Sequence, residues 1–576
     1  MKSKKLMATL LAVTVVASSA LVGCGGGNKE DQVKDNNKKP DVATEEKDAP
    51  KDAEQFLNEY SGEPTTLDPV KATTNTTWAP QGMIYEGLTR YQPQPDGTGK
   101  MEPGVAESWE ASSDGLKYTF KLRKDSKWHD GKPVTAKDFV YTWQRVVDPK
   151  TGSGYGTVFN GIVKNATDIA NGKKKPEELG VKAVDDNTFE VELEKPCAFF
   201  MELTYFPVLK PVRKDIVEKY GKEYGSDAKY IMGNGAYKLT EWVHKNKLVF
   251  EKNNDFWDAK NRFITKVTWK NIPDENAKMQ AYQNGEIDSV YTSDANWVEK
   301  FKSEDTSKHI TSPTNSVEYF IVNAKNEYLK NAKVRQAITL GFDREEFCKN
   351  IINGVGIPAY GLIPPTISVA EGKPYTSLVK NDFIKQLQEE HKDPKKLLQE
   401  GLKELGKPED TSKVQIRLYS RGTREQDKEE AEFFQQQFKQ KLGIELKVEQ
   451  MEYDIMYDRV DKGNFDLALG GWFADWDDPS SYLDNHNSVD GYYRKTGWVN
   501  KEYDELSKKA KNTKDPKERA ELYGKAEKIL LHDESAIIPI YIGKRSTFRR
   551  NYVKNSFATN FGFGDLKGIY ISGRKK

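Results

Sequence analysis

Two periodicities alternate along this chain, and their alternation constrains the fold more than any other feature of the sequence. Lys117 to Leu122 alternates apolar and polar residues, which is the period of a half-buried strand. Thr135 and Asp138 have the spacing of a capping box, and apolar residues at helical spacing follow them through Val147. The second half repeats the alternation, with strands predicted at 414–419, 444–448 and 465–469 and helices at 429–442 and 517–530. Strands that alternate with helices predict an α/β architecture.

Composition admits a large core and excludes one class of function. The 576 residues are only 36% apolar, but 28 Tyr, 25 Phe and 11 Trp supply bulky core material. At roughly 150 residues per domain, this length predicts three or four domains, or fewer large ones. Lys and Arg number 89 against 88 Asp and Glu, so no basic field is available to hold nucleic acid. The three cysteines lie far apart in the sequence and cannot form a disulfide scaffold.

The first 24 residues have the composition of an export signal. Three lysines precede an apolar run from Leu6 to Val22, which is short for a membrane span. The run ends in Leu-Val-Gly before Cys24, which resembles the small residues that precede a cysteine modified with diacylglycerol. We therefore predict a lipoprotein signal peptide at 1–23 and lipidation of Cys24. A plain signal peptide with an incidental cysteine is the alternative.

The segment at 24–53 separates this signal from the first periodic residues. It is rich in Lys, Glu, Asp and Asn and contains no aromatic residue, so it cannot bury a core. A flexible tether of this length spans on the order of 30 Å. No later apolar run approaches the ~20 residues that a spanning helix needs. We expect a protein anchored by lipid to the extracytoplasmic face of the cell membrane.

Signatures of enzymes and of cofactor binding are missing from the sequence. The six histidines form no HExxH pair and no close ligand set, so no metal site is expected. The sequence contains neither a GxxxxGK[ST] nucleotide loop nor a GxSxG hydrolase elbow. The acidic run at 475–478 fails as a calcium loop because Pro479, Ser480 and His486 stand where a ligand, a glycine and a glutamate belong. We expect no catalytic residue, no cofactor and no enzymatic activity.

Several ordered motifs resemble one family of transport proteins. They are AESW at 106–109, DGLKYTFKLR at 114–123 and WHDGKPVTAKDF at 128–139. TLDP at 66–69, GNGAY at 233–237, GEID at 285–288 and GGWFADW at 470–476 support them. From about residue 56 to 576, the chain resembles the family 5 extracytoplasmic solute-binding proteins of ABC transporters, in particular the oligopeptide-binding branch.

The resemblance implies a two-lobed periplasmic-binding-protein-like fold with an extra inserted domain and a ligand cleft between the lobes. Lobe I would comprise 54–85, 214–315 and 542–576, the inserted domain 86–213, and lobe II 316–541. Segments near 315 and 541 would form the hinge, because closure needs only a few residues to absorb the rotation. The aromatic residues of the signature motifs are predicted to pack in the core of the inserted domain, namely Trp109, Tyr118, Phe120, Trp128 and Trp143.

The resemblance also implies how a peptide would be held. A carrier of many peptides reads the groups that peptides share, and it reads their backbone by strand addition. In relatives, the segment that matches Gly470 to Ala474 offers its main chain to the peptide, with Gly471 and Phe473 as the pairing positions. Asp475 resembles the aspartate that takes the peptide α-ammonium, a desolvated cation that needs a charged partner. A turn-capping role for Asp475 is the alternative.

Other positions resemble cleft-facing residues of the relatives. Trp472 would form a wall of a side-chain pocket, although core packing is the alternative for a lone tryptophan. By their neighbouring motifs, four further residues match cleft-facing positions, namely Tyr319, Tyr155, Asn75 and Tyr453.

The sequence departs from some relatives near the same motif. Arginines suited to a peptide carboxylate are replaced here by Leu469 and Val460, and Phe473 stands where some relatives have a disulfide cysteine. Peptide length and any contact with the C-terminal carboxylate therefore stay open.

The function implied is uptake of oligopeptides by a monomeric carrier. It would capture peptides outside the membrane and deliver them to ABC permease subunits that work with cytoplasmic ATPases. Two alternatives share the fold. The solute could instead be a dipeptide, a nickel complex or an oligosaccharide, or the ligand could be a signalling peptide. The aspartate in its aromatic setting favours an α-ammonium over a sugar.

Overall fold

The computed structural model describes residues 49–94, 99–292, 294–370, 372–422, 425–489, 491–557, 560–561 and 564–575. These belong to one compact unit, Pro40–Lys576. The predicted signal peptide at 1–23, Cys24 and most of the predicted tether lie outside the described residues. No helix in the described ranges is both long enough and apolar enough to cross a membrane.

A four-stranded sheet joins the start of the described chain to its middle. Its strand order is β1 (Phe56–Ser61), β10 (Lys266–Asn271), β9 (Lys247–Lys252) and β8 (Tyr237–Val243), with β1 parallel to β10. Its core includes Leu57, Phe250 and Val267. Because β1 pairs with a strand some 200 positions later in the sequence, the chain between them leaves this sheet and returns to it.

The chain between β1 and β10 forms a second four-stranded sheet. The sheet has the order β4 (Ala106–Ala111), β5 (Lys117–Leu122), β7 (Thr188–Glu192) and β6 (Val181–Asp185). Helix α2 (Ala136–Val147) packs on it and begins with the capping box of Thr135 and Asp138. The predicted strand and helix are both confirmed. Phe120, Trp128 and Trp143 are buried as predicted, and Trp109 and Tyr118 pack half-buried against the same core.

The largest sheet has seven strands and holds most of the second half of the chain. Its order is β11 (Ser289–Thr292), β19 (Ile537–Arg550), β12 (Ser307–Val322), β18 (Leu467–Phe473), β16 (Gln415–Arg421) and β17 (Glu445–Met451), and β13 (Gly356–Pro358) pairs with β19. The three strands predicted in this region are confirmed, with one difference. The strand predicted at 465–469 begins at Leu467, because the Phe465 carbonyl accepts from Asn323 Nδ2 at 2.6 Å in the preceding turn, and it continues to Phe473.

Helices cover both faces of this sheet, as alternating side chains show. Phe320, Leu467 and Leu469 face one core together with α8 (Ala332–Leu340), α11 (Pro394–Glu404) and α12 (Glu425–Leu442). Tyr319 and Ala468 face the opposite core together with α16 (Pro516–Lys528). Successive strand residues point to opposite faces, so both faces are buried. The predicted helix at 429–442 is confirmed within α12. The helix predicted at 517–530 is confirmed as α16, which ends at Lys528 and continues into the π-helical turn Ile529–Asp533.

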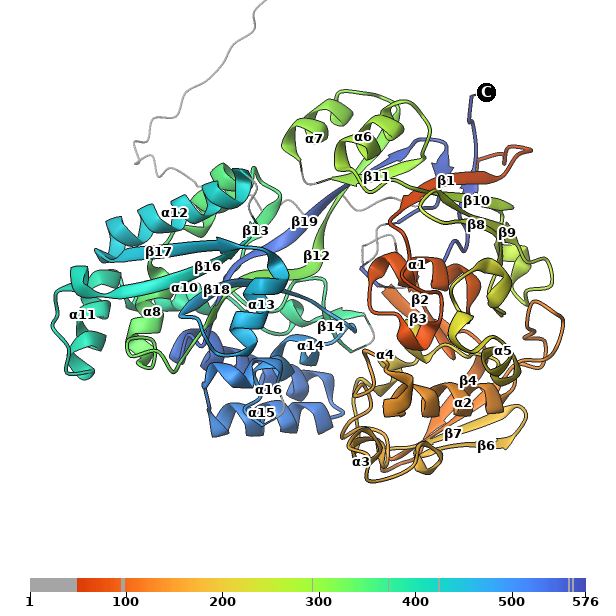
Figure 1. Cartoon of the computed structure of the whole chain (residues 1–576), viewed down its shortest axis with the longest axis horizontal. Coiled ribbons are helices and arrows are strands. Elements are labelled where there is room, and N and C mark those ends of the chain that lie inside the picture. Colours follow the sequence, from red (N-terminus) through yellow and green to blue (C-terminus); the bar gives the residue numbers. More distant parts are fainter. Residues whose placement is uncertain are drawn as a thin grey trace, which may run out of the picture. The chain divides into compact units, whose positions relative to one another are not determined.

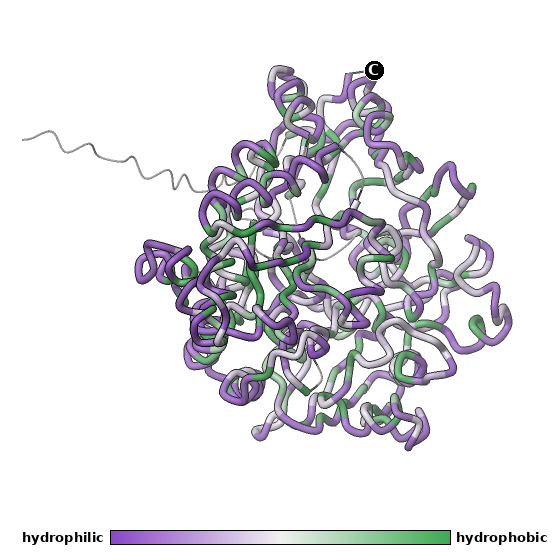
Figure 2. The backbone as a smooth tube through the Cα atoms, turned by 60° about the vertical axis from the view of Figure 1, so that its left-hand side comes forward, coloured by the Kyte–Doolittle hydropathy of each residue, from purple (hydrophilic) through white to green (hydrophobic). Residues whose placement is uncertain are grey.

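The remaining elements complete the inventory. Further helices are α1 (Asn75–Ile84), α3 (Ala166–Ala170), α4 (Phe200–Leu203), α5 (Lys214–Tyr220), α6 (Glu275–Gln283), α7 (Ala295–Lys302), α9 (Arg344–Glu346), α10 (Phe383–Glu390), α13 (Tyr453–Asp461), α14 (Ser480–Leu483) and α15 (Lys501–Asn512). Short strands are β2 (Thr89–Pro93), β3 (Gly99–Pro103), β14 (Ser368–Ala370), β15 (Lys373–Pro374), β20 (Val553–Lys554) and β21 (Tyr570–Ile571). Hydrophobic stretches concentrate on the inner strands, and hydrophilic ones on the outer helices (Figure 2).

Two long strands run side by side out of the body of the seven-stranded sheet. β12 and β19 pair over most of their lengths and reach from β18 to β11 (Figure 1). Their register shifts between Pro313 and Val317 and again between Glu318 and Tyr319. The crossings predicted near 315 and 541 fall on these strands. The domain boundaries themselves stay a prediction.

Candidate functional site

The second half of β18 has one paired edge and one open edge. β12 pairs with β18 along all of Leu467–Phe473, whereas β16 pairs only with Leu467 and Ala468. Beyond Ala468, no described strand pairs with the side of β18 that faces away from β12. An unpaired edge presents main-chain N–H and C=O groups that can bind an extended chain.

The hydrogen bonds of Ala474 show which residues direct their main chain to the open edge. The Ala474 N–H donates to the Asn315 carbonyl at 3.1 Å, and the Ala474 carbonyl accepts from Asn315 Nδ2 at 3.2 Å. Main-chain groups alternate direction along a strand, so Trp472 also faces β12. Gly471 and Phe473 therefore direct their N–H and C=O groups to the open edge, whereas those of Ala474 are already bonded to Asn315.

Gly471 leaves room for a partly buried ion pair beneath this edge. A Cβ at position 471 would lie 2.5 Å from Glu318 Oε1. Glu318 accepts a hydrogen bond from Arg421 Nη2 at the end of β16, and burial raises the pKa of its carboxyl. Position 471 therefore needs glycine, whereas the neighbouring Phe473 side chain is 53% exposed.

Asp475 follows directly after the open edge. Its Oδ1 accepts from the Tyr155 hydroxyl at 3.1 Å, and its N–H donates to Ser481 Oγ at 2.9 Å. Within the described ranges, no Lys, Arg or His side chain forms an ion pair with Asp475, although the carboxylate is half-buried. Burial raises the pKa of Asp475 to about 6, and the Tyr155 hydrogen bond opposes that rise. The carboxylate lacks the cation that would stabilise its charge.

Tyr155, whose hydroxyl donates to Asp475, packs against the core of the second four-stranded sheet. Its ring packs against Trp78 and Phe206, with centroids 5.9 and 5.0 Å away. Trp78 lies on α1, whose exposed first residue is Asn75. The structure thus brings Asp475 and Tyr155 into direct contact and places Asn75 one helical turn from a residue that packs on Tyr155.

The other predicted aromatic residues belong to a group beside β18. Trp472 packs on Tyr492 with centroids 5.6 Å apart, and its indole N–H has no hydrogen-bond partner among the described residues. Tyr453 is 53% exposed and packs on Tyr457. Tyr319 differs from the cleft-facing position expected for it, because its side chain is 1% exposed and its hydroxyl lies 2.7 Å from that of Tyr493. Its side chain therefore packs in the core under the edge.

Sequence reasoning missed several residues that shape this region. They are Glu318 and Arg421 under Gly471, Ser481 on the main chain of Asp475, and Tyr492 against Trp472. The Tyr492-Tyr493 pair was a visible aromatic signal in the sequence. The charged pair carried none, because Glu318 and Arg421 lie 103 positions apart. In the same described ranges, no group of three or more His, Cys, Asp or Glu side chains could hold a metal ion.

Comparison with known proteins identifies the family. The model of the bacterial extracellular solute-binding proteins, family 5, middle region, matches residues 100–494. The chain belongs to this family of solute-binding proteins.

Individual relatives match over nearly the whole chain. The dipeptide-binding protein DppE of Bacillus subtilis (strain 168) is 32% identical over 506 residues, 88% of this chain and 90% of DppE. The periplasmic oligopeptide-binding protein OppA of Salmonella typhimurium (strain LT2) is 34% identical, over 85% of this chain and 87% of OppA. The crystal structure of Haemophilus influenzae OppA in complex with RPPGFSPFR superposes with a TM-score of 0.73 at 29% identity, covering 91% of this chain and all of that one. These matches confirm the predicted α/β, two-lobed periplasmic-binding-protein-like fold.

Proposed function

We propose that this protein captures peptides with a free N-terminus and delivers them to an ABC importer. The observation that carries the proposal is the half-buried carboxylate of Asp475, which follows an open strand edge and has no cationic partner among the described residues. A ligand α-ammonium would supply the missing charge.

The open edge accounts for the rest of the ligand. An extended peptide whose ammonium meets Asp475 would pair its backbone with the outward main-chain groups of Phe473 and Gly471. Such pairing reads no side chain, so it tolerates many sequences. Trp472, Tyr453 and Asn75 would border the ligand side chains, and polar side chains could be met by water in roomy pockets.

The names of the relatives support a peptide over other solutes. DppE and OppA are named as dipeptide- and oligopeptide-binding proteins, and the superposed Haemophilus OppA holds a nine-residue peptide. An oligosaccharide would leave the charge of Asp475 without a partner. A signalling peptide would use the same groups as a nutrient, so native mass spectrometry of peptides that co-purify with the protein decides ligand class and length.

The decisive experiment is a thermodynamic cycle that combines a protein mutation with a change in the ligand. Asp475→Asn keeps the shape of the side chain and removes its charge, which should weaken binding of a free tripeptide by about 30- to 5,000-fold, since losing one member of a desolvated pair costs on the order of 2–5 kcal/mol. The N-acetylated tripeptide lacks the ammonium, so it should bind the wild type weakly and lose far less on mutation. Calorimetric titration measures all four combinations.

The control variant is Asp454→Asn, which removes an exposed carboxylate on the nearby helix α13. It should leave both affinities unchanged. Additive effects of acetylation and Asp475→Asn would place the ammonium elsewhere and leave Asp475 as a turn residue.

We propose further that the protein is a monomer anchored by lipid on Cys24. We also propose that two lobes close over the ligand. Lobe I comprises 54–85, 214–315 and 542–576, lobe II comprises 316–541, and the domain at 86–213 is inserted into lobe I. Cys24→Ala should move the protein from the membrane fraction to the medium without changing peptide affinity. Unchanged fractionation would refute the anchor.

A saturating peptide should reduce the radius of gyration in small-angle scattering, and an equal radius with and without peptide would refute closure of the lobes.

A further inference from the structure

A second polar site lies between the first four-stranded sheet, the segment that follows α1 and the C-terminal segment. It is a pocket of about 40 Å³ lined by charged side chains, namely Glu86, Arg90, Lys210, Arg262 and Asp565. A cavity needs roughly 10–15 Å³ to hold one water, so this pocket has room for a small solvent-derived occupant.

The charges around the pocket are buried and only partly satisfied. Lys210 and Arg262 are 8% and 2% exposed, and the Arg90 side chain is 11% exposed. Arg90 Nη1 lies 3.8 Å from Glu86 Oε1, and Arg90 Nε lies 3.6 Å from Glu102 Oε2. Both distances are too long for direct hydrogen bonds, so Arg90 Nη1 and Nε keep unused donor capacity.

Donors outnumber acceptors among the atoms left without partners. Arg90 Nε, Arg90 Nη1 and Arg262 Nε make no hydrogen bond in the described structure, and one carboxylate oxygen, Glu86 Oε1, likewise makes none. Lys210 Nζ carries three protons and donates to the Tyr85 carbonyl at 3.1 Å. Water brings two donors of its own that need acceptors, whereas a halide only accepts. The excess of donors therefore favours an anion.

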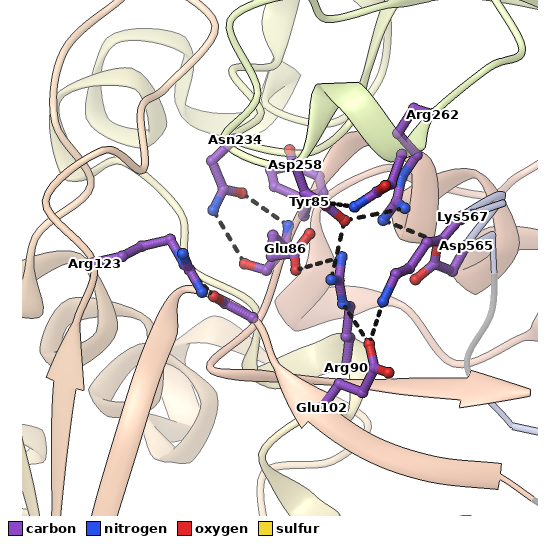
Figure 3. A network of polar contacts seen from close by, with 12 residues as sticks. Tyr85, Glu86, Arg90, Glu102, Arg123, Asn234, Asp258, Arg262, Asp565 and Lys567 are labelled. Atoms are coloured by element: carbon purple, nitrogen blue, oxygen red, sulfur yellow. Dashed lines mark hydrogen bonds and ion pairs between the residues drawn. The ribbon is translucent and has the colours of Figure 1, made fainter.

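We propose that this pocket binds a monovalent anion of halide size, held by Arg90, Lys210 and Arg262. The surrounding contacts hold these donors in place before the anion arrives. Asp258 accepts from Arg90 Nη2 at 3.1 Å and pairs with Arg262, whose other terminal nitrogen lies 3.1 Å from Asp565 (Figure 3). The anion binds the donor atoms that these pairs leave over.

The charges around the pocket leave room for an anion. Five cations, namely Arg90, Arg123, Arg262 and Lys567 in Figure 3 together with Lys210, face four carboxylates, namely Glu86, Glu102, Asp258 and Asp565, so a monovalent anion would balance the cluster. Glu86 faces Arg90, Arg262, Asp565 and Lys210, and burial raises the pKa of its carboxyl despite the nearby cations. Asn234 fixes its backbone through bonds of 3.0 and 3.1 Å. An anion in the pocket would lie beside the Glu86 carboxyl, so its binding should strengthen when Glu86 takes up a proton.

Bromide is the probe that tests the site without any peptide. The midpoint of thermal unfolding should rise in sodium bromide, and saturate, relative to sodium gluconate of equal ionic strength, because a ligand that binds only the folded state stabilises it. The effect should grow as the pH falls, because burial raises the pKa of the Glu86 carboxyl. Burial lowers the pKa of Lys210 only to about 8, so that lysine stays charged below pH 7. Crystals grown in bromide should show an anomalous peak in the pocket.

Two variants separate the anion from a general salt effect. Lys210→Met should abolish the bromide shift, whereas Lys124→Met, an exposed lysine on the same part of the chain, should keep it. Glu86→Gln should keep the shift and remove its pH dependence. If Lys210→Met fails to fold, the wild-type anomalous map and Glu86→Gln still decide. Equal unfolding midpoints in bromide and gluconate, or a map that shows only water, would overturn the proposal.

Discussion

Two aspartates three positions apart differ in what surrounds their charges. Asp478 forms an ion pair of 2.5 Å with Arg519, and both side chains are nearly inaccessible at 2–3% exposure. Asp475 is half-buried, accepts from one tyrosine hydroxyl and has no cation among the described residues. The described structure pairs the first charge with a cation and gives the second none. A buried carboxylate is thus a candidate ligand group when its charge is unsatisfied, rather than because it is acidic or lies in a motif.

Asp478→Asn should give the largest effect, and on stability. It leaves the Arg519 guanidinium buried without its charged partner, which should lower the free energy of unfolding by about 3–5 kcal/mol. Chemical denaturation measures the loss. Peptide affinity of the folded fraction should stay within a fewfold of wild type. A variant as stable as the wild type would show that the two aspartates do not differ in this way.

Gly471→Ala should give the next largest effect, and it should lower both stability and peptide affinity. The added methyl group displaces the Glu318 carboxylate from Arg421, at a cost of about 1–3 kcal/mol in stability, and distorts the edge that would bind peptide. Gly470→Ala is the matched control, because its Cβ would meet Ile321 and Tyr319 on the opposite face. Gly470→Ala should lower stability without weakening peptide affinity. An equal affinity loss in both variants would argue against backbone pairing at Gly471.

Peptide affinity should depend on pH through Asp475. Its pKa of about 6 without ligand means that the carboxylate is mostly ionised at pH 7 and mostly protonated at pH 5. An ammonium binds the ionised form, so affinity should fall about tenfold from pH 7 to pH 5. Calorimetric titration across this range measures the slope. The same slope in Asp475→Asn would assign it to another group.

Asp475→Asn should give the smallest effect when stability is measured without peptide. The raised pKa means that the folded protein binds the proton more tightly than the unfolded chain, so ionisation of Asp475 destabilises the fold as pH rises from about 4 to 6. The neutral variant should therefore be more stable than the wild type at pH 7.5, a gain that disappears below pH 4. A destabilised variant at pH 7.5 would make Asp475 a structural residue like Asp478.

Local patterns predicted those parts of the fold that local physics determines. The capping box of Thr135 and Asp138 and the alternation of Lys117 to Leu122 each specify one element through neighbouring residues, and both are confirmed. β12 gave no such signal, because its first half is polar and contains Pro313. Only its pairing with β19, more than 200 positions later, makes it a strand of 16 residues.

The candidate site illustrates the same limit. Asp475 and Tyr155 lie 320 positions apart, and no spacing in the sequence predicts their hydrogen bond. Resemblance to a family brought both residues forward, but it also selected Tyr319, whose side chain packs in the core. A motif specifies a position on a strand. The face to which the side chain points depends on the register of β18 against β12, which the sequence alone did not reveal.

The pairing of β12 with β19 also brings the two ends of segment 317–542 next to each other, so that this segment could be exchanged as a unit. Val317 and Ile542 are direct partners in the antiparallel pair of β12 and β19, so their Cα atoms lie about 5 Å apart. Everything between them, including the open edge of β18 and Asp475, enters and leaves through neighbouring points. A graft of 317–542 into a relative would exchange this edge as one unit, with two adjacent splice points and no new loop.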